Sequence, residues 1–165
     1  MKKILKTMFV LMCGCVMATA LVSCGSDGDD GGNNKQFTIN GEWMSDYNGG
    51  RFEFYTLNGN SVNCVIYTVS FSSFLSQVII NGTTLNTKDI TNIQKVENNG
   101  SFTYDKLQLI CTFPEVKIEG FVTVHDYEEF VWSRGLSNIT MIRANSKTNA
   151  LKAQLEQEYQ AKYAK

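Results

Sequence analysis

The chain has 165 residues, with 15 Lys and Arg against 16 Asp and Glu, one His and one Pro. This length accommodates a single folded domain, and the balanced charge, without a dense basic stretch, excludes the electrostatic pattern of nucleic-acid-binding proteins. We therefore expect one domain and no nucleic-acid partner.

The N-terminus is typical of a secretory signal peptide over residues 1–23. A basic start with three lysines precedes the uncharged stretch 7–22, which is shorter than the ~20 apolar residues of a transmembrane helix. Residues 21–24 read LVSC and resemble the lipobox of bacterial lipoproteins. The resemblance implies a diacylglycerol thioether on Cys24 and cleavage of the chain before this residue.

Residues 24–35 are rich in Gly, Asp and Asn, a composition that predicts a flexible tether. Acidic residues this close to a lipidated cysteine resemble the surface-export signal of Bacteroidota lipoproteins. The resemblance implies a protein held in the outer membrane by its acyl chains and facing the cell exterior. A lipoprotein facing the periplasm would carry nearly the same N-terminus. Cleavage leaves 142 residues and removes three basic residues and no acidic ones, so the mature chain carries a net charge of about −4.

The segment 36–146 is predicted to be an all-β domain. Thr, Val, Ile, Tyr and Phe are frequent, and they alternate with polar residues in several stretches. We expect an antiparallel meander closed into a barrel of about eight strands, with a β-sandwich as the alternative. The expected strands are 41–46, 51–57, 62–71, 75–80, 88–96, 102–112, 116–124, 128–133 and 138–143. Asn-Gly pairs at 40–41, 48–49, 58–59, 81–82 and 99–100 favour tight hairpin turns.

Residues 147–165 are predicted to form a C-terminal α-helix. Leucine and tyrosine recur every four residues from Leu151 to Tyr163, and Ser146 or Asn149 can cap the helix start. The apolar stripe can pack on the barrel wall, belong to a loose tail or bind a protein partner.

A second resemblance links the first and last strands. Gly41-Glu42-Trp43 near the start and the strand ITMIR ending at Arg143 are similar to motifs of the lipocalin-like domains of Bacteroidota lipoproteins. The resemblance implies that Trp43 plugs the closed end of an up-and-down barrel. It also implies that Arg143 lies across the Trp43 ring in a cation–π contact.

Two cysteines remain in the mature chain besides Cys24. In an oxidising compartment Cys64 and Cys111 could form a disulfide. Alternation places Cys111 on an inward face, whereas Cys64 fits either face of its strand. Two buried free thiols are therefore the alternative.

The sequence offers little support for catalysis, and we predict a protein without enzymatic activity, cofactor or metal. The single histidine, His125, is expected in a surface turn between two strands. The carboxylates Asp46, Glu53 and Asp105 are scattered along the chain and are expected to be solvated.

Aromatic side chains are the remaining candidates for a binding site, although such residues are more often part of the core. We select Phe54, Tyr67, Phe130 and Trp132 as candidate ligand-binding residues. The favoured hypothesis is a non-catalytic binding module for a small apolar or glycan ligand. The alternative is a structural or accessory protein that binds a protein partner in the cell envelope. A solidly packed lumen would argue against the first hypothesis, and an exposed apolar stripe on the helix would favour the second.

Overall fold

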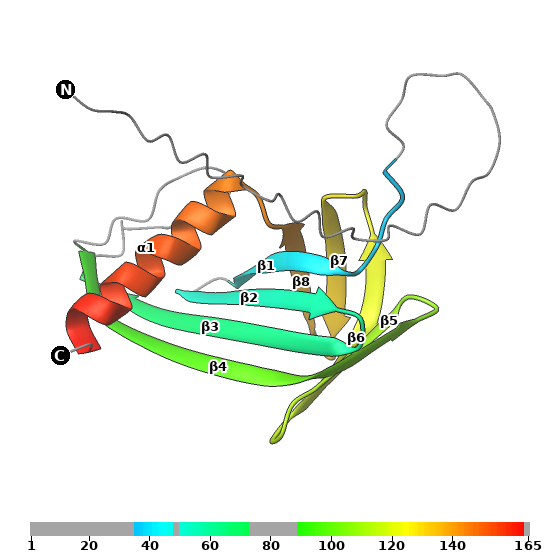
Figure 1. Cartoon of the computed structure of the whole chain (residues 1–165), viewed down its shortest axis with the longest axis horizontal. Coiled ribbons are helices and arrows are strands. Elements are labelled where there is room, and N and C mark those ends of the chain that lie inside the picture. The colour runs from blue at the N-terminus through cyan, green and yellow to red at the C-terminus, as the bar shows by residue number, and fades with distance from the viewer. Residues whose placement is uncertain (1–34, 48–49, 73–88, 164–165) are drawn as a thin grey trace, which may run out of the picture. The chain divides into compact units, whose positions relative to one another are not determined.

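The computed structural model describes residues 35–47, 50–72 and 89–163. Eight strands and one helix follow one another along this part of the chain (Figure 1). They are β1 (Gly41–Tyr47), β2 (Arg51–Asn58), β3 (Ser61–Phe71), β4 (Ile90–Asp105), β5 (Gln108–Thr112), β6 (Lys117–Val124), β7 (Glu129–Arg134), β8 (Ser137–Arg143) and α1 (Ser146–Tyr163). The predicted signal peptide, the lipobox with Cys24, the tether up to residue 34 and the predicted strand 75–80 lie outside the described residues.

The strands form a closed antiparallel barrel in which each pairs with its neighbours in the sequence. Closure is made by β1 and β8, which pair from Trp43↔Arg143 to Ser45↔Met141. The predicted meander barrel with a C-terminal helix is therefore confirmed, and the β-sandwich alternative is wrong. Closure gives β1 and β8 a partner on both edges, which removes two exposed strand edges.

The hairpin turns differ in part from the Asn-Gly prediction. Asn58 ends β2, and the turn after it has positive φ only at Gly59, a pattern typical of type II′. The β4–β5 turn uses Lys106 and Leu107, both with positive φ, although neither is a glycine. The prediction of a turn at Asn99-Gly100 is wrong, because both residues lie inside β4.

Gly100 has a packing role instead. A Cβ atom at this position would lie 2.0 Å from the carbonyl oxygen of Thr112 in β5. Only a glycine therefore allows β4 to pass this close to β5. The result is a single 16-residue strand that pairs with β3 as far as Ser101 and with β5 from Ser101 onward.

The barrel has two hydrophobic clusters on opposite sides of β1–β4. The interior cluster includes Trp43, Tyr55, Phe130 and Trp132. The outer cluster lies under α1 and consists of Met44, Phe52, Phe54, Val65, Tyr67, Val69, Ile90, Ile93, Leu151 and Leu155. Strand β2 and the first half of β3 are thus buried on both faces, which explains the unbroken run of buried residues from Phe52 to Tyr55.

Helix α1 packs on the barrel wall, which is the first of the three arrangements that the sequence left open. Leu151 and Leu155 are buried, whereas Tyr163 at the end of the helix is exposed. The predicted cap at Ser146 or Asn149 is wrong. The Oδ1 of Asn145 accepts hydrogen bonds from the backbone N–H groups of Lys147 and Thr148, and Thr148 Oγ1 accepts one from the N–H of Asn145. This reciprocal pair is a capping box.

Candidate ligand-binding site

The two ends of the barrel differ in structure. The Trp43 end is formed by the connections β2–β3, β4–β5 and β6–β7, and β1 begins there. At the opposite end, the Glu53 end, strands β1, β3, β5 and β7 finish and strands β2, β4, β6 and β8 begin.

The Trp43 end contains the contact that the lipocalin-like motifs implied. The guanidinium carbon of Arg143 lies 4.1 Å from the centre of the Trp43 ring and 4.0 Å from that of Tyr127. Arg143 also donates hydrogen bonds to the carbonyl oxygens of Thr38, Asn40 and Tyr127, at 2.9, 3.3 and 2.8 Å. These bonds fix the segment before β1 across this end of the barrel. The end is further filled by Phe130, whose ring centre lies 4.6 Å from that of Trp43.

The four candidate ligand-binding aromatics are not gathered in one place. Phe130 and Trp132 are fully buried in the interior cluster. Phe54 and Tyr67 lie in the outer cluster under α1, where their rings meet edge to face at 6.0 Å. They cannot line one site, because the wall of the barrel separates the two pairs.

A cluster of charged and polar side chains occupies the interior at the Glu53 end. One oxygen of Glu53 accepts a hydrogen bond from Arg51 Nε at 2.9 Å. The other oxygen accepts hydrogen bonds from the Tyr55 hydroxyl at 2.8 Å and from an Arg134 NH group at 3.1 Å. The same Arg134 group lies 3.2 Å from the Tyr55 oxygen. We call Arg51, Glu53, Tyr55 and Arg134 the Glu53 cluster.

The expectation that Glu53 is solvated is wrong, because only 2% of this residue is exposed. Burial by itself would raise the pKa of the Glu53 carboxyl. The charge of Arg134 and the hydrogen bonds from Arg51 and Tyr55 outweigh this effect, and the pKa lies below its ordinary value. Burial raises the pKa of Tyr55 well above its ordinary value, so its hydroxyl remains a donor. The cluster therefore holds a carboxylate between two guanidinium groups.

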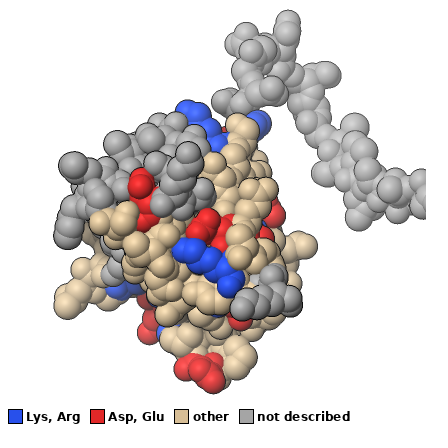
Figure 2. Space-filling view, turned by 90° about the vertical axis from the view of Figure 1, so that its left-hand side faces the viewer, with Lys and Arg blue, Asp and Glu red and all other residues tan. Residues whose placement is uncertain are grey.

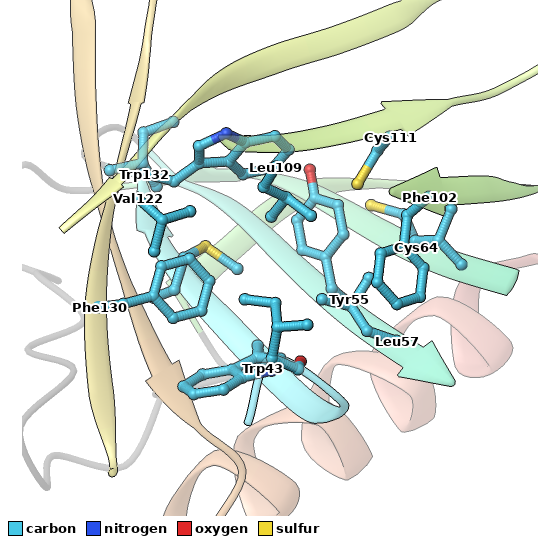
Figure 3. Close-up of a cluster of buried hydrophobic side chains, with 14 of the residues drawn as sticks. Trp43, Tyr55, Leu57, Cys64, Phe102, Leu109, Cys111, Val122, Phe130 and Trp132 are labelled. Atoms are coloured by element: carbon cyan, nitrogen blue, oxygen red, sulfur yellow. Dashed lines mark hydrogen bonds between the residues drawn. The ribbon is translucent and has the colours of Figure 1, made fainter. Parts of the chain in front are cut away.

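Two further polar atoms are buried in the barrel without a hydrogen-bond partner among the described residues, namely Ser45 Oγ and Trp132 Nε1. Ser45 pairs directly with Glu53 across β1 and β2. Figure 3 shows that the Trp132 nitrogen and the Tyr55 hydroxyl both point to the side of the interior cluster that lies away from Trp43. The Trp132 nitrogen is packed against the backbone of Gly120, where an added Cβ atom would lie 2.8 Å from it.

The inward face of the barrel becomes open to solvent beyond the Glu53 cluster. Val96 pairs with Ile66 on this face, yet it is 51% exposed. The next inward pair, Thr68 and Gln94, is also exposed. The cause is the length of β3 and β4, which extend past the short β5 (Figure 1). Ile118 on β6 is partly buried against the interior cluster below this open face.

Both remaining cysteines are buried, and their thiols are free, so the proposed disulfide is not formed. Figure 3 shows their Sγ atoms pointing toward one another. However, Cys64 lies on β3 and Cys111 on β5, with β4 between them. Two strand spacings separate the backbones by about 9–10 Å, beyond the Cα separation that a disulfide spans. Burial raises the pKa of each thiol to about 12.

A groove of about 510 Å³ lies outside the barrel, between α1 and strands β3 and β4. Lys95 bridges Glu97 and Glu156 across it, at 2.7 and 2.8 Å, and Tyr67 donates a hydrogen bond to Glu156. Figure 2 views the molecule from the side where α1 ends beside β3 and β4, and it shows basic and acidic side chains next to one another. The ionic contacts in this groove connect the helix to the sheet.

The remaining predictions concern catalysis and the membrane. His125 lies exposed in the connection between β6 and β7. Within residues 35–47, 50–72 and 89–163, no group of three or more His, Cys, Asp and Glu side chains is placed to hold a metal ion. In the same residues, no helix has both the length and the apolar character needed to cross a membrane.

Sequence reasoning missed Arg51 and Arg134, considered Tyr55 only as one of several aromatics that could line a binding mouth, and placed Glu53 in solvent. One available signal was alternation, which puts Arg51, Glu53 and Tyr55 on one face of β2 and Phe52 and Phe54 on the other. Either face could have been the inner one.

Comparison of the chain with models of known protein families, with curated proteins and with solved structures found no match.

Proposed function

We propose that this protein is an outer-membrane-anchored lipoprotein that acts as a non-catalytic binding module for a small ligand at the Glu53 end of its barrel. The observation that carries the proposal is the Glu53 cluster, a buried carboxylate between two arginines below a solvent-exposed inward face. Buried ion pairs contribute little net stability, because desolvation of the charges offsets their attraction. Retaining one in a barrel interior is therefore better explained by recognition than by folding.

The packing of the barrel limits where a ligand can bind. The interior side chains of Trp43, Phe130 and Trp132 are at most 1% exposed. A ligand enclosed deep in the barrel would have to displace these aromatic rings. We therefore assign binding to the Glu53 end, with the ligand lying against the exposed faces of β3 and β4.

The place where the chain enters the barrel fits an anchored binding module. Residues that precede β1 are attached to the Trp43 end through Arg143. A lipid anchor at Cys24 would therefore be connected to the barrel at the end opposite the proposed site. The Glu53 end would be left free to meet a ligand while the acyl chains remain in the membrane.

Native mass spectrometry of the protein purified gently from bacterial membranes tests this proposal. The denatured mass reports whether Cys24 is lipidated and the first 23 residues are removed, and a Cys24→Ala variant serves as the control. We expect an additional mass in the native spectrum that is lost on denaturation. A lipidated chain that is empty in every preparation would contradict the ligand-binding function.

One observation favours the alternative, a protein that binds an envelope partner. Phe121 projects from the outer face of β6 and is 68% exposed, and it pairs with Gln108 next to the exposed Leu107. The predicted apolar stripe of α1 does not support this alternative, because Leu151 and Leu155 are buried against the barrel. Crosslinking at the cell surface with and without Phe121→Ser would detect such a partner.

A further inference from the structure

We infer that the ligand is an amphiphile with an anionic head group, which Arg51 and Arg134 bind. This inference rests on the proposed function and specifies the chemistry of the same site. The apolar part of the ligand would lie on the inward-facing side chains of Ile66, Val96 and Ile118.

The hydrogen-bonding capacity of the site consists mostly of donors. Glu53 already receives three hydrogen bonds, from Arg51, Tyr55 and Arg134. Among the described residues, the remaining N–H groups of Arg51 and Arg134 have no acceptor. Guanidinium groups donate and cannot accept. The ligand must therefore supply acceptors.

The charge of the site points in the same direction. Two arginines face one carboxylate, which leaves one positive charge uncompensated within the cluster. The Arg134 side chain is only 13% exposed, whereas that of Arg51 is 44% exposed. Arg134 thus holds its charge where water screens it poorly, and Arg51 presents its charge to the entrance. Hydrogen bonds from such groups to an anionic oxygen are among the strongest in proteins.

The apolar half of the ligand is inferred from the exposed inward face. Val96 is half exposed, and Ile66 and Ile118 are partly buried beside the interior cluster. An aliphatic chain covering these side chains would remove apolar surface from water. A carboxylate or phosphate without such a chain would leave this surface exposed, and a cationic head group would meet the arginines.

Three probes with saturated alkyl tails of nearly equal length separate the contributions of the head group. Dodecanoate, dodecyl maltoside and dodecyltrimethylammonium are titrated below their micelle concentrations, with calorimetry and tryptophan fluorescence as readouts. We expect dodecanoate to bind at least about tenfold more tightly than the other two. Acetate should not bind measurably, because it lacks the tail.

Single substitutions then assign the head-group contacts. Arg51→Gln, which changes a side chain that is 44% exposed, and Arg134→Gln should each weaken dodecanoate binding about tenfold. Lys117→Gln, which removes the same charge from the outer face of β6, should leave binding unchanged. Far-UV circular dichroism confirms that each variant is folded.

The outcomes distinguish the inference from the function on which it rests. Binding of dodecyl maltoside as tight as that of dodecanoate would overturn the anionic head group and leave the binding function intact. The same conclusion follows if Arg51→Gln and Lys117→Gln both bind dodecanoate like the unmodified protein. If none of the three probes binds and the native mass spectrum is empty, the binding function fails as well.

Discussion

Replacement of Arg134 by methionine should destabilise the barrel strongly, because it leaves a buried carboxylate without the more deeply buried of its two counter-charges. The guanidinium lies 3.1 Å from Glu53, whose side chain is 3% exposed. Removing one partner of such a pair costs about 3–5 kcal/mol. Arg51 still contacts Glu53 at 2.9 Å, but its side chain is 44% exposed and it compensates only in part. We therefore expect a loss of about 3 kcal/mol in the free energy of unfolding.

Urea unfolding followed by tryptophan fluorescence measures this loss. The double variant Glu53→Gln, Arg134→Met removes both charges, so it should recover about 2 kcal/mol of the cost of the single substitution. Lys117→Met is the matched control, since Lys117 and Glu119 form an ion pair in which both side chains are 55% exposed. It should cost less than about 1 kcal/mol. A loss for Arg134→Met no larger than that of the control, or a double variant as unstable as the two single losses added together, would refute the reasoning.

Three further predictions concern the rest of the barrel. Arg143→Met should cost about 2–3 kcal/mol in urea unfolding, because three hydrogen bonds to backbone carbonyls are lost. In a Cys24→Ser variant at pH 8, a thiol reagent should label neither Cys64 nor Cys111 in the folded protein, and it should label both once the chain is unfolded. Labelling of either thiol in the folded protein would contradict their burial. Hydrogen bonds from Lys95 and Tyr67 lower the pKa of Glu156 from 4.5 to about 2. The contribution of Glu156 to stability is therefore complete above pH 4.5 and is lost as the pH falls toward 2. Because Glu156 is about one-third exposed, Glu156→Gln should remove about 1 kcal/mol or less of this acid-sensitive stability in unfolding measured at both pH values.

The fold could be predicted from the sequence because alternation and turn residues are local signals. Seven of the eight observed strands begin within two residues of a predicted strand, and the lipocalin-like motifs indicated that β1 meets β8. The error lies at β4 and β5. Asn99-Gly100 has the composition of a turn, but its glycine serves a close approach between strands. The real turn uses Lys106 and Leu107, which carry no turn signature.

The proposed binding site was harder to predict, because β2 is buried on both faces. Alternation separates Phe52 and Phe54 from Glu53 and Tyr55, and an apolar face normally turns inward. Here the two phenylalanines face outward and α1 covers them, so the polar face lies inside the barrel. Sequence alone does not reveal which face the helix covers. The partner of Glu53, Arg134, comes from a strand 81 residues away, which no local pattern indicates.

The two arginines at opposite ends of the barrel show why only one end is assigned to a ligand. Arg143 donates hydrogen bonds to three backbone carbonyl oxygens, and its guanidinium group lies between the rings of Trp43 and Tyr127. Three of its five N–H donors are therefore used to hold the backbone, and its role is to close the barrel. Arg134 uses one NH group for Glu53 and Tyr55, while its remaining N–H groups have no acceptor in the described part of the chain. Its side chain is 13% exposed beside the open face, so these N–H groups can donate to water or to a ligand, and this difference is why we propose recognition at the Glu53 end.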